Sequence, residues 1–81
     1  MREIDTEKTA ENIKNAFSKS GKSRFEIAES LDCSIAVFYY WLVGRSLPTL
    51  QNFFNLCDIL NVEPYDILVF KKEDANIWKK V

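Results

Sequence analysis

The sequence predicts an all-α fold built from five helices. Apolar residues recur at spacings of three and four along most of the chain, and no segment alternates apolar and polar residues with a period of two. The four residues that most often start or stop helices fall where this pattern begins or ends: Gly21, Gly44, Pro48 and Pro64. A chain of 81 residues has room for one hydrophobic core, so we expect one small domain.

The first helix is expected to begin near Asp5 or Thr6, because both residues are good N-caps, and to run to Ser20. Gly21 then ends it. One face of this helix is apolar and is expected to be buried: Ala10, Ile13 and Phe17. Residues 1–5 carry no pattern that predicts a fixed structure.

Two short helices joined by a tight turn are expected between residues 23 and 43. Ser23 and Glu26 have the spacing of a capping box, and Ser34 is a good N-cap for the second helix. The apolar residues of the first helix are Ile27, Ala28 and Leu31, and those expected to face the core from the second are Val37, Phe38 and Trp41. Helices this short are marginal in water, so the flanking segments must supply their core.

A fourth helix is expected from Thr49 to about Asn61 and a fifth from Pro64 to about Phe70. The fourth helix has a wide apolar face: Leu50, Phe53, Phe54, Leu56, Cys57 and Leu60. Against it we expect the fifth helix to pack Ile67, Leu68 and Phe70. These elements complete a domain that spans residues 1–70.

Residues 71–81 form a half-charged C-terminal tail with only two large apolar residues, Ile77 and Trp78. We expect this tail to be loosely ordered, or to dock through Trp78 onto the body of the protein or onto a second subunit.

Composition excludes several classes of protein. No run of 18 apolar residues exists, and Met1 leads into charged sequence, so we expect a cytoplasmic protein with no membrane partner. Cys33 and Cys57 lie in apolar patterns, without a CxxC motif or any histidine, and are interpreted as small buried hydrophobic residues. The sequence has no histidine, phosphate-binding glycine loop or nucleophile paired with a base, so neither an enzyme nor a cofactor is expected.

The distribution of charge is more informative than the net charge of −1. Between residues 13 and 50 there are five basic residues and three acidic ones, and no acidic residue lies between Cys33 and Cys57. The acidic excess is in the N-terminal arm and after Asp58. The central part of the chain can therefore approach an anionic surface.

The order and spacing of these features resemble those of a known family. The matching features are Gly21, Ser23, Ile27, Ala28, Leu31, Ser34, Phe38, Trp41, Gly44, the run 46–50, Leu56, the run 60–62 and the run 66–68. Residues 13–69 resemble the helix-turn-helix domain of phage repressors and xenobiotic-response-element-like (Cro/cI-type) bacterial regulators. The resemblance implies a five-helix, lambda-repressor-like DNA-binding domain and a sequence-specific transcriptional regulator, with repression as its expected action.

Two residues within the predicted turn illustrate the pattern. Ala28 lies where the two helices are expected to pass closest, so a larger side chain there would push them apart. Asp32 occupies a position that is usually glycine in such turns because the backbone tends to be left-handed, a conformation that aspartate tolerates better than most residues.

In the family, the first helix of the pair crosses the DNA backbone and the second lies in the major groove. The resemblance therefore implies that Arg24, in the first turn of the first helix, contacts a phosphate. Weaker candidates for backbone contact are Lys19, Lys22 and Arg45. Ser34 can cap its helix and still offer its backbone N–H or hydroxyl group to a phosphate.

The outward residues of the second helix are expected to be Ile35, Ala36, Tyr39 and Tyr40. None of them can make the bidentate contacts by which arginine or an amide distinguishes bases. Ile35 and Ala36 can pack on thymine methyl groups, and the tyrosines can donate to a phosphate or a base edge. Leu42 and Val43 extend this apolar surface.

Two interpretations of this surface follow. The first is a regulator that binds double-stranded DNA as a homodimer, with dimer contacts from the fifth helix and the tail. The second is a protein-interaction module that keeps the fold and binds a protein partner through the apolar patch. The patch is also explained if the tail folds across it and makes it part of the core.

Overall fold

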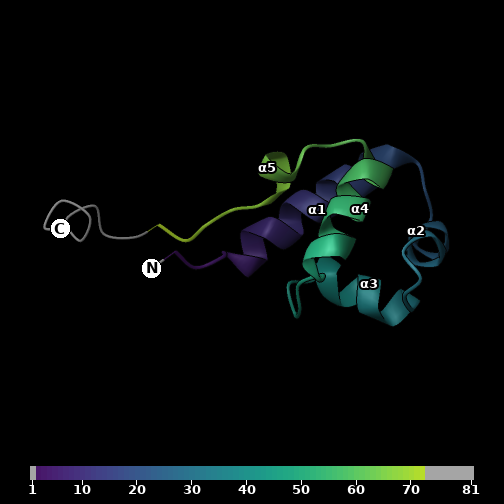
Figure 1. Cartoon of the computed structure of the whole chain (residues 1–81), viewed down its shortest axis with the longest axis horizontal. Helices are drawn as coiled ribbons and strands as arrows, with labels where there is room; N and C mark the ends of the chain where they lie inside the picture. The colour runs from purple at the N-terminus through teal and green to yellow at the C-terminus, as the bar shows by residue number, and fades with distance from the viewer. Residues whose placement is uncertain (1, 73–81) are drawn as a thin grey trace, which may run out of the picture.

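The computed structural model describes residues 2–72, and these residues contain five α-helices (Figure 1). In chain order the helices are α1 (Thr6–Ser20), α2 (Arg24–Ser30), α3 (Ile35–Leu42), α4 (Leu50–Leu60) and α5 (Pro64–Ile67). The predicted all-α class and the predicted order of helices are confirmed. The predicted end of the fifth helix is wrong, because the backbone is already extended at Leu68.

Local capping explains where the helices begin. The Asp5 side chain accepts a hydrogen bond of 3.0 Å from the Lys8 backbone N–H at the start of α1. At the start of α2 the capping box is complete, since the Glu26 N–H donates to Ser23 Oγ over 3.1 Å and the Ser23 N–H donates to Glu26 Oε1 over 3.4 Å. Thr49 likewise caps α4 by accepting from the Asn52 N–H. Each side chain satisfies a backbone donor that the helix itself leaves without a partner.

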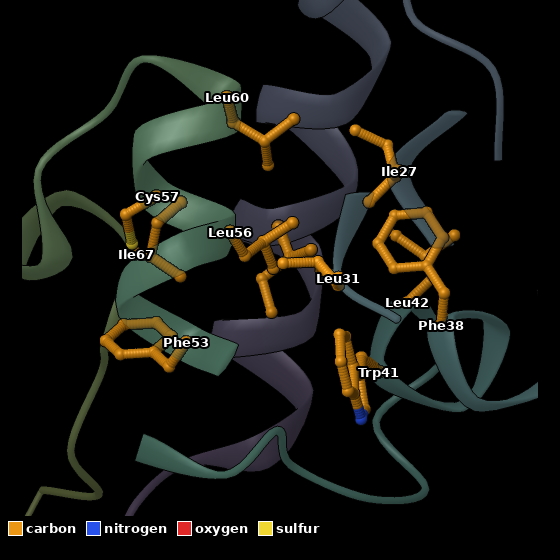
Figure 2. Packing of buried hydrophobic residues seen from close by; sticks show 11 residues of the cluster. Ile27, Leu31, Phe38, Trp41, Leu42, Phe53, Leu56, Cys57, Leu60 and Ile67 are labelled. Atoms are coloured by element: carbon orange, nitrogen blue, oxygen red, sulfur yellow. The ribbon is translucent and has the colours of Figure 1, made fainter. Parts of the chain in front are cut away.

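The core lies where α1, α3 and α4 meet, with α2 and α5 covering its ends (Figure 2). Phe38 is its centre: this fully buried ring packs edge-on against Phe17 at 5.3 Å and against Trp41 at 6.0 Å, measured between ring centroids. Burial of such a ring contributes about 2 to 3 kcal/mol. The buried cluster comprises Ile13, Ile27, Leu31, Phe38, Trp41, Leu42, Phe53, Leu56, Cys57, Leu60 and Ile67. This core fixes α3 through its inner face and leaves its other side to solvent.

Two predicted orientations on α3 are wrong. Val37 was expected in the core but is 38% exposed, whereas Leu42 was expected at the surface but is only 7% exposed. The face that is buried consists of Phe38, Trp41 and Leu42, which lie three and four residues apart. At 3.6 residues per turn Val37 lies about a quarter turn from the centre of that face.

The apolar face of α4 is also narrower than predicted. Phe53, Leu56, Cys57 and Leu60 are buried, but Leu50 and Phe54 are exposed. Leu50 is the first residue of the helix and projects beyond the core. Together with Leu47 and Leu68, these two side chains line a shallow apolar groove of about 250 Å³ beside the N-terminal segment.

The N-terminal segment, for which no structure was predicted, pairs with the chain that follows α5. Ile4 and Phe70 form an isolated antiparallel bridge, the Asp5 N–H donates to the Val69 carbonyl over 2.7 Å, and the Lys71 N–H donates to the Glu3 carbonyl over 2.7 Å. This pairing lies at the opposite end of the molecule from α2 (Figure 1).

A buried threonine locks the same pairing to α1. The Thr9 hydroxyl accepts a hydrogen bond of 3.0 Å from the Val69 N–H and donates to the Val69 carbonyl over 3.4 Å. One turn later, the Asn12 side-chain amide donates to the Ile67 carbonyl over 3.0 Å. These contacts satisfy the carbonyl of Ile67, at the end of α5, and the backbone groups of Val69 beyond the helix, so α1 holds the chain after α5 in place.

Trp78, through which docking of the tail was predicted, lies outside the described residues, as does Ile77. Cys57 is buried and Cys33 is half-buried, in agreement with their interpretation as small hydrophobic residues. None of the helices among residues 2–72 is both long and apolar enough to cross a membrane.

Candidate nucleic-acid interface

The bend between α2 and α3 forms over four residues. Asp32 has the left-handed conformation predicted for it, with a φ of 53°, and its N–H donates to the Glu29 carbonyl. The N–H of the next residue, Cys33, donates to the carbonyl of the buried Ala28 over 3.0 Å. Ser34 then caps α3 by accepting from the Val37 N–H over 3.1 Å. The two helices are therefore joined by the tight turn that the sequence predicts.

All eight predicted site residues are exposed: Lys22, Arg24, Ser34, Ile35, Ala36, Tyr39, Tyr40 and Arg45. They lie on α3, at the start of α2 and in the turns that adjoin these two helices, and none contributes to the buried cluster. Each of these side chains is therefore accessible to a macromolecular partner.

Four of these residues form a continuous row on the outer side of α3. The guanidinium carbon of Arg24 lies 5.9 Å from the centre of the Tyr39 ring, and that of Arg45 lies 5.6 Å from the centre of the Tyr40 ring. The two tyrosine rings are 6.2 Å apart and tilted by 55°. We call Arg24, Tyr39, Tyr40 and Arg45 the arginine–tyrosine row. It places one cation at each end of a pair of aromatic rings.

The sequence places both arginines where they can reach α3. Arg24 precedes Ile27 by three residues and Ala28 by four, so it lies one turn earlier on the side of α2 that adjoins α3, where its position at the start of the helix leaves it exposed. At the other end of the row, the N–H of Arg45 donates to the Tyr40 carbonyl over 2.9 Å, which turns the chain back toward α3. Exposed cation–aromatic pairs stabilise by about 0.5 to 1 kcal/mol, enough to favour these positions of the guanidinium groups.

The structure separates the predicted lysines from this row. Lys19 and Lys22 line a different cleft, together with Ile59 and Asn61 at the C-terminal end of α4. The Lys22 N–H also donates to Ser20 Oγ in the turn between α1 and α2. These two cations therefore flank the helix pair and do not lie on the outer side of α3.

Two exposed apolar residues of the helix pair were not predicted as part of the candidate site. Phe25 in α2 is 62% exposed, and Val37 in α3 was assigned to the core. The signal for Phe25 was present, since it lies outside the spacing that links Ile27, Ala28 and Leu31. With Ile35 and Val43, these side chains add exposed apolar groups to the helix pair.

Comparison with known proteins identifies the fold. No protein-family model matches this sequence, and no curated protein sequence matches it. Among solved structures, the restriction-modification controller protein C.AhdI from Aeromonas hydrophila is similar, with a TM-score of 0.70 and 19% sequence identity over 78% of this chain and 96% of that chain. The chain has the helix-turn-helix fold. The resemblance on which the sequence analysis relied is thus confirmed at the level of the fold.

The parts of this surface can now be located on the two helices of the helix-turn-helix fold. The row extends from the first residue of α2, across the middle of α3, to the residue after Gly44. Ile35 and Ala36 lie in the first turn of α3, next to the Ser34 cap. No acidic residue lies between Cys33 and Cys57, so α3 and the segment after it carry only the positive charge of Arg45. This surface suits a negatively charged partner.

Proposed function

We propose that this protein is a sequence-specific DNA-binding transcriptional regulator that places α3 in the major groove and α2 across the DNA backbone. The observation that carries the proposal is the arginine–tyrosine row, because it sets one guanidinium group on each side of the exposed tyrosine pair of α3. The similarity to a restriction-modification controller protein supports the same assignment, since that protein has the same fold.

In this proposal the arginines contact phosphates on either side of the groove. A guanidinium group stacked on an aromatic ring keeps its N–H edge for bidentate contact with a phosphate. Tyr39 and Tyr40 lie between the two arginines and donate from their hydroxyl groups to phosphates or base edges. The Ser34 hydroxyl oxygen already accepts from Val37, but its O–H remains a donor for a phosphate at the start of α3.

Lys19 and Lys22 have a secondary role in this arrangement. Both are exposed next to the turn that precedes α2, so they add to the positive potential beside the helix that crosses the backbone. Their contribution is to the rate of association and to non-specific affinity, because flexible lysines act as point charges and carry no base preference.

The proposed functional unit is a homodimer. One helix-turn-helix module covers too few phosphates and bases for useful affinity, so members of this architecture bind two half-sites through two copies. Surface for a second copy is offered by α5, whose Tyr65 is 80% exposed, and by Leu50 and Phe54 of the neighbouring α4. Repression is the proposed action, because a bound dimer occludes the DNA that it covers.

The first test is a titration of a fluorescent mixed-sequence duplex, followed by anisotropy at about 50 mM and about 200 mM salt. Neutralising several phosphates releases counterions, so the affinity is expected to fall steeply between these conditions. Failure of the folded protein to bind at the lower salt concentration would contradict the proposal.

A second candidate function rests on the apolar side chains around the row. Phe25, Ile35, Val37 and Val43 are all exposed on the helix pair, and exposed apolar patches commonly mark protein interfaces. In this alternative, the protein keeps the helix-turn-helix fold but binds a protein partner through α3. The two functions differ in what the loss of Tyr39 does, as described in the Discussion.

A further inference from the structure

The exposed face of α3 has an unusual chemical composition for a helix that recognises bases. Its side chains are Ile35, Ala36, Val37, Tyr39 and Tyr40, and none carries an amide, a carboxylate or a cation. Direct recognition of guanine or adenine by bidentate hydrogen bonds needs such groups. If α3 distinguishes sequences by direct contact, its first turn must use apolar contact.

Only one base substituent in the major groove is apolar. It is the methyl group on C5 of thymine, which occupies the same place in the groove when it is carried by 5-methylcytosine. Cytosine and uracil lack it. A protein surface without hydrogen-bonding groups therefore discriminates pyrimidines that carry this methyl group from those that lack it.

The structure places two apolar side chains where such contact is made. In helix-turn-helix proteins the N-terminal residues of the second helix face the base edges. Here these residues are Ile35, which is 46% exposed, and Ala36, directly after the Ser34 cap. Arg24 and Arg45 contact Tyr39 and Tyr40 in the following turn of α3, and α3 has no acidic residue. The positive charge of these two arginines suits a negatively charged partner such as DNA.

We propose that Ile35 and Ala36 recognise C5-methyl groups of pyrimidines in the major groove. This inference rests on the proposed function and adds the class of site: DNA in which thymine or 5-methylcytosine faces the first turn of α3. Removing one methyl group from water against an isoleucine side chain increases affinity about three- to fourfold. In a dimer both copies contribute, so the preference is expected to reach about tenfold.

Four duplexes of equal length test the inference. The first two are alternating adenine–thymine DNA and the same DNA with deoxyuridine in place of thymine; the other two are alternating guanine–cytosine DNA with and without C5 methylation. Affinities are measured by anisotropy at one salt concentration. We expect the methylated member of each pair to bind about three- to tenfold more tightly. The guanine–cytosine duplexes carry the methyl group on cytosine, so a preference seen in both pairs is due to the methyl group and not to the base that carries it.

Variants assign the preference to the first turn of α3. Ile35→Ser is expected to weaken the preference in both pairs, because only Ala36 is left to contact the methyl group, while salt-dependent binding remains because the arginine–tyrosine row is unchanged. Phe70→Ser is the matched control: Phe70 is 42% exposed but lies in the N-terminal pairing at the other end of the molecule from α2, so the preference should survive. Circular dichroism establishes that each variant is folded.

Each other outcome is decisive. Equal affinity within both pairs, or a preference for thymine over uracil without one for 5-methylcytosine over cytosine, would overturn the inference and leave DNA binding intact. A preference of undiminished size in folded Ile35→Ser would overturn its assignment to Ile35. Absence of salt-dependent binding to any duplex would instead contradict the proposed function.

Discussion

The guanidinium group of Arg24 lies over the ring of Tyr39, so the first residue of α2 contacts the exposed face of α3. We expect Arg24→Ala to lower the affinity for duplex DNA and to reduce the slope of log affinity against log salt by about one. The free energy of unfolding should change by less than about 1 kcal/mol, since an exposed cation–aromatic pair is lost.

Anisotropy titrations at several salt concentrations measure both effects. The control is Lys71→Ala, which also removes an exposed cation, but at the N-terminal pairing where Lys71 lies 3.2 Å from a Glu3 carboxylate oxygen. Unchanged binding by folded Arg24→Ala would remove Arg24 from the proposed interface.

Tyr39→Ala distinguishes the two candidate functions. If α3 lies in the major groove, this variant loses DNA affinity because both the tyrosine and the support for Arg24 disappear. A matched control exists at the other end of the molecule, where Arg2 lies 5.4 Å from the centre of the exposed Phe70 ring. Phe70→Ala removes an equivalent aromatic ring and should leave DNA affinity unchanged. Normal DNA binding by Tyr39→Ala would favour the protein-interaction module.

Trp41→Ala is expected to destabilise the fold by about 3 to 5 kcal/mol. Trp41 is buried and packs edge-on against Phe38, so the substitution empties space at the centre of a small core. Urea unfolding measures the change, and the neighbouring, exposed Tyr40→Ala should cost no more than about 1 kcal/mol. If Trp41→Ala melts at the wild-type temperature, the assigned orientation of α3 is incorrect.

Two glycines offer a matched test of backbone strain and crowding. Gly21 and Gly44 have φ values of 71° and 77°, so alanine is strained at both positions. A Cβ atom at Gly21 would meet no atom within 4 Å, whereas at Gly44 it would lie 3.3 Å from the Thr6 carbonyl oxygen. We expect Gly21→Ala to cost about 1 to 2 kcal/mol and Gly44→Ala to cost more. Equal costs in thermal unfolding would show that α1 moves aside.

The thiol of Cys57 makes stability depend on pH in the alkaline range. Burial, followed by the carboxylates of Asp58, Glu63 and Asp66, raises the pKa of Cys57 from 9.0 to about 11. Below pH 9 the thiol is protonated in both the folded and the unfolded state. Between these two values the unfolded state ionises first, so the free energy of unfolding falls as pH rises, by about 1 to 3 kcal/mol.

Cys57→Ala isolates this effect from other groups that titrate in the same range. Urea unfolding of both proteins at about pH 8 and about pH 10.5 should show a larger loss of stability in the wild type. A parallel decline of the two proteins would mean that Cys57 ionises equally easily when folded.

Local signals made much of the fold predictable. The capping box of Ser23 and Glu26, the left-handed backbone of Asp32 and the helix stop at Gly21 each depend on a few neighbouring residues. Such features are encoded by side chains that bond to their own backbone, or by the absence of a Cβ atom. Their residue preferences can therefore be read from the local sequence without knowledge of the tertiary contacts.

The wrong predictions concern features that are determined by contacts between distant parts of the chain. Nearly every residue of α3 is apolar or aromatic, so periodicity alone did not distinguish Val37 from Leu42 as a core residue. The pairing of Ile4 with Phe70 joins distant parts of the chain and leaves no local signal. It also explains the early end of α5, because Leu68 must become extended before the chain reaches the N-terminal segment.

The candidate site was predictable in part for the same reason. Exposure of residues such as Arg24 and Tyr39 followed from the positions of the two helices in the pattern. Their mutual contact did not, because it depends on the angle at which α2 crosses α3, which the turn at Asp32 sets. The roles of these residues in binding DNA stay predictions until affinity is measured.

The hydrogen bonds between Thr9 and Val69 bear on how the protein forms during its synthesis. The ribosome makes Thr9 early, but its hydroxyl group finds its partner only after a further 60 residues have been added. A nascent chain that stops before Val69 leaves this buried group without that partner, and such a group costs about 1 to 3 kcal/mol. The helix pair can thus leave the ribosome and pack against α1 before the hydrogen bonds between Thr9 and Val69 form. Chaperones and proteases therefore encounter an incomplete domain until residue 69 has left the exit tunnel.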